Sequence, residues 1–354
     1  MKLNYLLVFV PLSLILDWFG ANPVLIFITA TLATIPLAGI MAEATETLAV
    51  YLGPSLGGLL NASFGNAPEI IIGLLALKKG LPDVVKASFT GSILGNLVLG
   101  LGLSMIVGGA KHGFQRFDKL QAGMSAALLL LAAIGLIMPA MAEHVTPSHD
   151  VEITMGTAAT LLVVYALSVV FTLRHGGQIV DSEPTAGSAA PPPPAAHSQP
   201  HWSRGKALGI LIFVTVVLAF VSEVLTGAVE PASKSMGFTP VFAGVIALAL
   251  AGNTAQLYNA IRFSASNKMD LALSITVGAS TQVALFVAPL LALTSGLVGT
   301  SLDLVFTPFE VVSIVLAVFV TSKITADGEC NWMEGVLLVG VYLIFGVVFY
   351  ALPA

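Results

Sequence analysis

The sequence predicts an all-α polytopic membrane protein of eleven transmembrane helices, arranged as one N-terminal helix followed by two inverted five-helix repeats. Three observations predict this fold: an apolar composition, eleven apolar runs of spanning length, and two matching segments in the two halves of the chain. Of the 354 residues, 56% are hydrophobic and 9% are charged, and the mean hydropathy is +0.96. Soluble domains carry about 25% charged residues. This chain lacks the charge to cover a water-exposed surface, so lipid is its expected solvent.

Eleven apolar runs are long enough to cross a bilayer, which takes about 20 residues of helix. They cover residues 3–19, 23–41, 55–77, 84–107, 120–141, 153–173, 207–229, 241–263, 271–293, 304–320 and 336–352. The first run lacks a small-x-small cleavage pattern, so we interpret it as an uncleaved span and not as a signal peptide. We expect an N-terminal helix at residues 1–20, a first repeat at 21–175, a linker at 176–205 and a second repeat at 206–354.

The linker and the basic residues predict how the chain lies in the membrane. Residues 176–205 include four consecutive prolines together with His197 and His201, and such a composition cannot bury a core. A flexible, solvated linker is therefore favoured over a metal site at these histidines. Ten of the fourteen Lys and Arg residues fall on the N-terminal side of the eleven runs, and positive charge stays in the cytoplasm. The N-terminus and the linker are therefore expected inside, and the C-terminus outside.

Two short segments match between the halves of the chain. Residues 64–69 (FGNAPE) lie in the third run, and residues 251–256 (AGNTAQ) lie in the eighth. An offset of 187 residues relates them and also carries Asp83 to Asp270 and Gly91 to Gly278, while an offset of 184 carries Glu46 to Glu230. Each repeat has an odd number of spans, so the second copy must enter the membrane from the opposite side. Inverted repeats are common in secondary transporters, whose sites lie near the bilayer midplane.

Glu69 is the strongest candidate for a functional residue. It lies deep in the third run, where a charged side chain costs a few kcal/mol, so we expect it to face a cavity or a cation. Gly65 and Pro68 weaken the helix beside it, which frees backbone carbonyl groups. Carbonyl and carboxylate oxygens are the ligands of a hard cation such as Ca2+. The alternative is a protonated, buried glutamate that serves packing only.

Other polar side chains in the repeated spans are candidate cation ligands. They are Asn66, Ser92, Asn96, Asn253, Gln256, Ser280 and Gln282. Hydrogen bonds between packed helices are the alternative role, and for the two serines the two roles are equally favoured. Four carboxylates are candidate members of an ion pathway. Glu46, Glu223 and Glu230 lie near the ends of runs, where a wet helix end is the alternative, and Glu310, a secondary candidate, follows Pro308 in the tenth run, where we expect it to be buried. The loop at 143–152 contains three acids and two histidines, and a solvated loop is favoured there over a peripheral metal or pH-sensing site.

Several longer motifs point to a known family. They are residues 57–62 (GGLLNA), 65–69 (GNAPE), 91–96 (GSILGN), 252–253 (GN), 280–289 (STQVALFVAP), 303–310 (DLVFTPFE) and 327–332 (DGECNW). Together they resemble the Ca2+/H+ exchanger (CAX) family of the Ca2+/cation antiporter superfamily, and the likeness covers nearly the whole chain outside the linker. The resemblance implies eleven helices, with one gating helix and two inverted five-helix repeats around a midplane cation site.

The resemblance also implies a function. In that family the glutamate of each repeat motif binds Ca2+ and releases protons in exchange, and this role falls here on Glu69. The matching position in the second repeat is Gln256, which offers an amide oxygen but neither charge nor a titratable proton. The chain is thus expected to be a secondary active antiporter that exchanges Ca2+ for H+ by alternating access. Its expected partners are these ions and membrane lipid, with no cofactor beyond the transported cation and no enzymatic activity.

Gln256 leaves several alternatives open. In the first, another carboxylate compensates for the missing charge. In the second, the protein prefers a different ion, and in the third, exchange is impaired. A Na+-coupled or other cation exchanger of the same superfamily is therefore the main alternative function. A membrane-embedded enzyme is disfavoured because no histidine lies in any apolar run, and a passive channel because a charged midplane site suits occlusion better than conduction. The net charge of −5, without a basic stripe, argues against nucleic acid as a partner.

Overall fold

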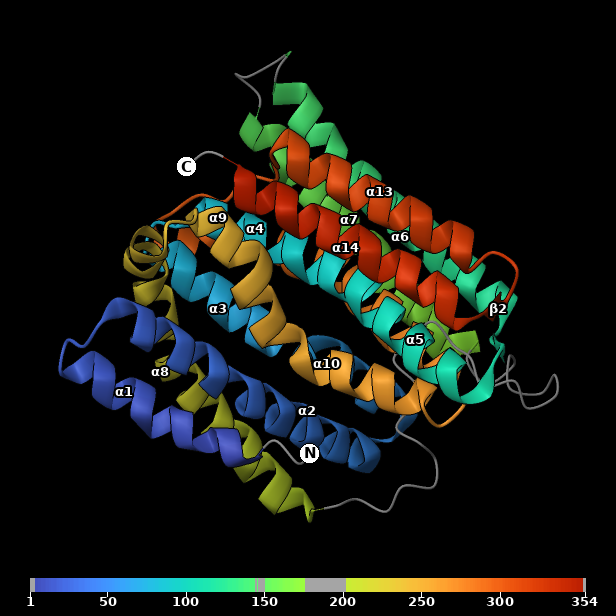
Figure 1. Ribbon diagram of the computed structural model, residues 1–354, viewed down its shortest axis with the longest axis horizontal. Helices are drawn as coiled ribbons and strands as arrows, with labels where there is room; N and C mark the ends of the chain where they lie inside the picture. Colours follow the sequence, from blue (N-terminus) through green and yellow to red (C-terminus); the bar gives the residue numbers. More distant parts are fainter. Residues whose placement is uncertain (1–3, 144, 146–149, 176–201, 353–354) are drawn as a thin grey trace.

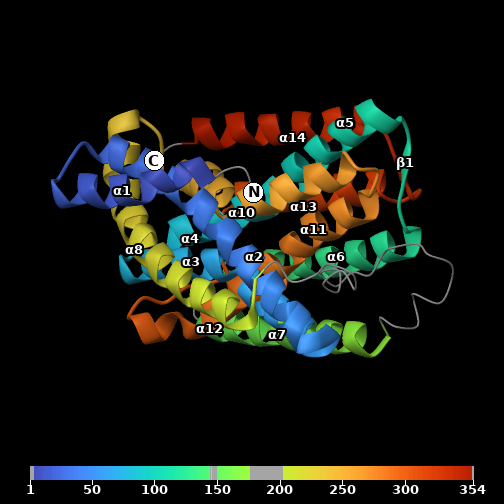
Figure 2. The same cartoon turned by 90° about the horizontal axis from the view of Figure 1, so that it is seen from below.

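The computed structural model describes residues 4–143, 145, 150–175 and 202–352, most of which lie in helices (Figures 1 and 2). In the first half the order is η1 (Asn4–Val8), α1 (Phe9–Trp18), α2 (Pro23–Phe64), α3 (Ala67–Lys78), α4 (Pro82–Leu94), η2 (Gly95–Gly100), α5 (Leu101–His112), α6 (Lys119–Glu143) and α7 (Asp150–His175). In the second half it is α8 (Arg204–Met236), α9 (Pro240–Ala243), η4 (Gly244–Leu248), α10 (Ala249–Ser264), α11 (Met269–Gln282), η5 (Val283–Val287), α12 (Ala288–Thr294), η6 (Ser295–Val298), α13 (Pro308–Ile324) and α14 (Trp332–Ala351).

Eight helices in this described part are long and apolar enough to cross a membrane. They cover residues 23–53, 82–112, 119–143, 151–172, 204–236, 240–264, 269–298 and 332–351. A shorter apolar helix covers residues 5–18, and α13 has 17 residues. The prediction of a largely helical, polytopic membrane protein is therefore confirmed. Most of the predicted linker lies outside the described residues, as do residues 144 and 146–149 of the acidic and histidine loop.

The only β-structure in the described chain is a two-stranded antiparallel ladder, which the sequence did not predict. It pairs β1 (Gln115–Arg116) with β2 (Glu329–Cys330), in the register Gln115 opposite Cys330. These strands precede α6 and α14, so the ladder joins connections from the two halves of the chain.

Three π-helical segments join neighbouring α-helices into continuous rods. η2 links α4 to α5, η4 links α9 to α10, and η5 links α11 to α12. The π-helix is rare and often marks a functional site. All three segments lie beside predicted site residues, because Asn96 is part of η2, η5 follows Gln282 directly, and η4 precedes the segment 251–256.

The helices bury two separate hydrophobic clusters. One is formed mainly by apolar side chains of α1, α2 and α8, and the other by side chains of the remaining long helices. Figure 1 shows α1, α2 and α8 together on one side of the molecule, with α5, α6, α13 and α14 on the other. In Figure 2, α14 runs along one edge and α7 and α12 lie along the opposite edge. The candidate ligands come from α3, α4, η2, α10 and α11, which lie between these outer helices.

Candidate cation site

The third predicted span is broken at the first matched segment. α2 ends at Phe64, Gly65 and Asn66 form a turn, and α3 begins at Ala67. Asn66 is the N-cap, with a non-helical φ of −110° and ψ of 15°, and Pro68 stands in the first turn, where its missing N–H costs nothing. The interruption predicted from Gly65 and Pro68 is thus confirmed. It places Glu69 in the first turn of a helix that starts inside the protein.

The Glu69 side chain is buried and lies against the second matched segment. The residue is 8% exposed, and neither carboxylate oxygen has a hydrogen-bond partner among the described residues. A Cβ placed on Gly252 would lie 3.3 Å from Glu69 Oε1, so a glycine is needed for this approach. The two segments that match in sequence therefore meet in space.

The amide of Asn253 joins α10 to α4. Its Nδ2 donates to Ser92 O at 3.2 Å, while its Oδ1 has no partner in the described chain. Asn96 lies farther along the same rod, in η2, and neither atom of its buried amide is hydrogen-bonded to a described residue. On the α11 side, Ser280 Oγ donates to Ile93 O at 3.3 Å. The end of α4 is thus held between α10 and α11.

The remaining three amides of the predicted set bond to each other or to their own helix. Asn66 Nδ2 donates to Gln282 Oε1 at 2.6 Å, which ties the broken helix to α11. Gln256 is half-buried, and its amide, oriented so that both of its atoms find partners, donates from the nitrogen to Gly252 O at 3.2 Å and to Asn253 O at 3.1 Å. Unlike the first matched segment, residues 251–256 lie inside an unbroken helix, because Ala255 stands where the first segment has a proline.

The four candidate pathway carboxylates lie in two kinds of surroundings. Glu46, Glu223 and Glu230 are exposed, and Glu230 pairs with Lys234 at 2.7 Å. Glu310 is 2% exposed. Its Oε2 accepts from Thr307 N at 2.9 Å and Thr307 Oγ1 at 2.8 Å in a capping box at the start of α13. Glu310 is therefore buried, as predicted, but its oxygens are occupied, in contrast to those of Glu69.

Oxygen atoms without partners mark the centre of the candidate site. Glu69 contributes two, and Asn96 and Asn253 contribute one each. A carboxylate with amide oxygens is the kind of ligand set that Ca2+ takes, in shells of six to eight oxygens. Within the described ranges, no three His, Cys, Asp or Glu residues gather closely enough to hold a metal ion. A cation at Glu69 would thus depend on amide, carbonyl and water oxygens for its other ligands.

One buried ionisable residue, Lys86, was not among the predicted site residues. The structure places Lys86 inside α4 with its side chain mostly buried between two aspartates. The signal was present, because Lys86 falls within the apolar run 84–107, and an ionisable residue in a span is a functional candidate by default.

Comparison with known proteins gives one consistent result. The chain matches the family described as sodium/calcium exchanger protein over residues 22–174 and 206–351. It is 40% identical to the Ca2+/H+ antiporter of Aphanothece halophytica, over 98% of this chain and 96% of that protein. It is 38% identical to the Ca2+/H+ antiporter ChaA of Bacillus subtilis (strain 168), over 97% of each. The solved structure of native YfkE matches with a TM-score of 0.86 at 34% identity, covering 99% of this chain and 100% of that one.

Proposed function

Since the chain belongs to the sodium/calcium exchanger protein family, we propose that it is a secondary active antiporter that exchanges Ca2+ for H+ across a membrane. The curated relatives that carry this activity in their names match it almost from end to end. They are transporters, and no enzymatic step is proposed. The observation that carries the proposal is the buried carboxylate of Glu69, whose two oxygens have no described partner and which lies against Gly252.

Exchange follows from the surroundings of this carboxylate. A buried, ionised group without hydrogen bonds is costly, so Glu69 is neutralised either by a proton or by a cation. The two ions then compete for the same oxygens, and a gradient of one drives movement of the other. Alternating access requires two bodies that move against each other. Two hydrophobic clusters, one centred on α2 and α8 and one in the other long helices, support such a division, with α3 and α4 contributing to both.

The proposed ligands divide into two groups. Glu69, Asn96 and Asn253 have unpartnered oxygens and are proposed to contact Ca2+ directly. The other predicted ligands, which are Asn66, Gln282, Ser92, Ser280 and Gln256, are proposed to shape the site or to contribute a carbonyl or hydroxyl oxygen.

For the membrane arrangement we propose eleven spans, formed by an N-terminal helix and two inverted five-helix repeats. The two matched stretches, 22–174 and 206–351, correspond closely to the proposed repeats. The offset of 187 residues also carries residues 96–100 of η2 onto the whole of η5. With the basic residues distributed as described, the N-terminus and the linker face the cytoplasm and the C-terminus lies outside.

The direct test is ion flux in proteoliposomes that hold the full-length protein. We expect an inward Ca2+ gradient to drive protons outward, and a pH gradient to drive Ca2+ uptake, without added Na+. A pH-sensitive dye and a Ca2+ indicator report the two fluxes. Ca2+ flux that follows a Na+ gradient and ignores the pH gradient would instead support the Na+-coupled alternative.

Asn96 offers a test that separates a ligand from a packing residue. Asn96→Leu replaces an unpartnered buried amide by an apolar side chain of similar shape, which relieves a desolvation penalty of about 1–3 kcal/mol. We therefore expect a higher melting temperature without Ca2+, together with a half-saturating Ca2+ concentration raised about tenfold. Thermal unfolding with and without Ca2+, and flux against Ca2+ concentration, measure the two effects. Unchanged Ca2+ dependence would remove Asn96 from the ligand set.

A further inference from the structure

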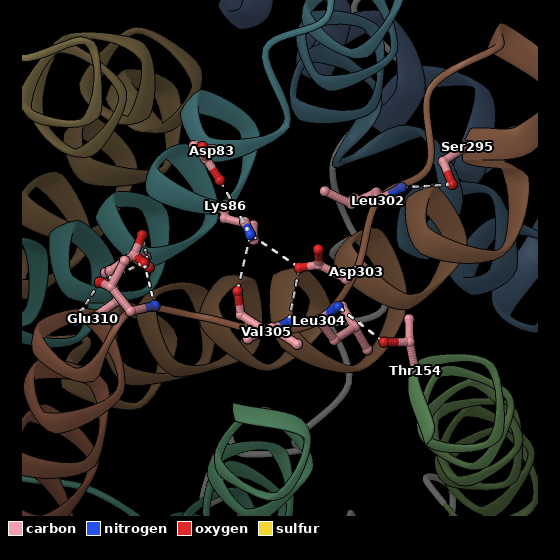
Figure 3. A network of polar contacts seen from close by, with 11 residues as sticks. Asp83, Lys86, Thr154, Ser295, Leu302, Asp303, Leu304, Val305 and Glu310 are labelled. Carbon is pink, nitrogen blue, oxygen red and sulfur yellow. Dashed lines mark hydrogen bonds and ion pairs between the residues drawn. The ribbon is translucent and has the colours of Figure 1, made fainter. Parts of the chain in front are cut away.

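A mostly buried ammonium group ties the start of α4 to the segment that precedes α13 (Figure 3). The Lys86 side chain is 11% exposed, whereas those of Asp83 and Asp303 are 76% and 49% exposed. Lys86 Nζ lies 3.2 Å from Asp83 Oδ1 and 2.9 Å from Asp303 Oδ1. It also donates to Val305 O at 2.9 Å. An ammonium group has three protons to donate, so these three contacts use all of them.

The partner segment, residues 300–307, is extended, and we call it the strap. It is not helical. Its apolar side chains, including Leu302 and Leu304, are buried in the hydrophobic cluster formed by the long helices other than α1, α2 and α8. Leu302 N donates to Ser295 Oγ at 3.0 Å, and Leu304 N donates to Thr154 Oγ1 at 3.3 Å. Figure 3 shows these contacts on either side of Asp303. The strap is therefore fixed to η6, to α7 and, through Lys86, to α4.

Glu310 fixes a second point on α4, one helical turn after Lys86. Besides capping α13, Glu310 accepts a hydrogen bond at its Oε1 from Thr90 Oγ1 at 3.3 Å. Residues four apart lie on one face of a helix, so Lys86 and Thr90 meet the strap and the start of α13 from the same face. Farther along, Thr321 of α13 donates to Leu97 O at 3.4 Å. Contacts to the strap and α13 thus occur at Lys86 and Thr90 of α4 and at Leu97 of η2.

Another part of α4 meets the cation site. Ser92 O accepts the hydrogen bond from Asn253, and Asn96 follows in η2. α4 is therefore held between the strap with α13 and the second matched segment. Its position along its own axis sets where Ser92 and Asn96 lie relative to Asn253. Mutation of a residue that orients metal ligands typically costs about 10- to 100-fold in metal affinity or activity.

We propose that Lys86 is a positioning residue for cation binding: by fixing α4 to the strap, it sets where the end of α4 and Asn96 lie relative to Asn253, whose neighbour Gly252 lies against Glu69. The inference rests on the proposed function, because it concerns the same site, although Lys86 does not itself contact the cation. The three charged side chains are buried to different extents, and this predicts an order of effects on the melting temperature. Without Lys86 the two exposed aspartates remain solvated, whereas without Asp303 a mostly buried ammonium loses a partner, which is the costlier change.

The first experiment compares Lys86→Met with Lys86→Arg in proteoliposomes. We expect Lys86→Met to raise the half-saturating Ca2+ concentration about tenfold, the smaller end of the effect of losing a residue that orients metal ligands, with the maximal rate changed less than about twofold. Lys86→Arg keeps the charge and the donors, so it should restore most of the Ca2+ affinity. Melting temperatures of the purified variants show whether each one folds.

A second set of variants tests Asp303, the partner of Lys86 in the strap. Asp303→Asn should lower the melting temperature more than Lys86→Met does, and the double variant Lys86→Met with Asp303→Asn should melt at a higher temperature than Asp303→Asn alone. Asp303→Asn should also raise the half-saturating Ca2+ concentration, because it weakens the link between Lys86 and the strap. Arg116→Gln is the matched control, because it breaks the exposed Arg116–Glu329 pair, whose side chains are 84% and 43% exposed. It should leave the Ca2+ dependence as in the wild type.

The outcomes are distinct. A folded Lys86→Met protein with wild-type half-saturating Ca2+, or one that loses only maximal rate, overturns the inference. If Lys86→Met does not fold, Asp303→Asn decides, and wild-type Ca2+ dependence in that variant overturns it equally. If the proposed function itself is wrong, the wild-type protein will show no Ca2+-dependent proton flux in the same proteoliposomes.

Discussion

Replacing Glu69 by Gln is expected to abolish Ca2+-driven proton movement in proteoliposomes. The substitution keeps the shape of the side chain but removes the only carboxylate whose oxygens are buried and unpartnered among the described residues. Two unit charges about 4 Å apart interact by about 4 kcal/mol at an intermediate effective dielectric constant, and Ca2+ carries twice the charge. We therefore expect Ca2+ affinity to fall at least a hundredfold, and the proton site to be lost with it.

The matched control is Glu329→Gln, which neutralises a partly exposed carboxylate paired with Arg116 on β1. That variant should keep wild-type flux, so that loss of charge at the surface is separated from loss of charge at the site. Wild-type flux in Glu69→Gln would exclude Glu69 from the exchange step, and another acid would have to be sought.

Gln256→Glu is expected to strengthen Ca2+ binding. Gln256 lies one helical turn after Gly252, which touches Glu69, so a carboxylate there would add a second negative charge close to the bound cation. The new side chain loses the two hydrogen bonds that the amide donates to the backbone, which reduces the gain. We expect the half-saturating Ca2+ concentration to fall about tenfold, equivalent to about 1.4 kcal/mol. Flux measured over a range of Ca2+ concentrations gives this value.

Gln256→Met separates the effect of charge from the loss of the amide. It has a similar length, carries no charge and donates no hydrogen bond, so an improvement seen in both variants would come from releasing the amide alone. Weaker Ca2+ transport in Gln256→Glu, combined with a response to Na+ or K+, would show that Gln256 suits a different cation.

Much of the central geometry followed from local sequence rules. Gly65 and Pro68 predicted a helix break, and the helices end and restart within two residues of Gly65. The matching segments predicted that two distant parts of the chain share a site, and Glu69 does lie against Gly252. These features depend on backbone chemistry and on internal repetition, and both can be recognised in one amino-acid sequence.

Other features depend on contacts between distant residues and could not be predicted in the same way. Lys86 acquires its role from Asp303, more than 200 residues later in the chain. Two further features have local signals in the sequence. Thr307-x-x-Glu310 has the spacing of the capping box that Glu310 forms at the start of α13. The continuous helix at 251–256 follows from Ala255, which stands where the first matched segment has Pro68.

The break at Gly65 and Asn66 gives the cation site a one-sided electric field. α3 begins there, and the start of a helix carries roughly half a positive charge, whereas α10 runs past the same point without an end. That partial charge repels an arriving metal ion, so it offsets part of the attraction that the Glu69 carboxylate exerts on the cation. An ion held in this way is bound loosely enough to leave again, and a carrier must release its cargo in every cycle.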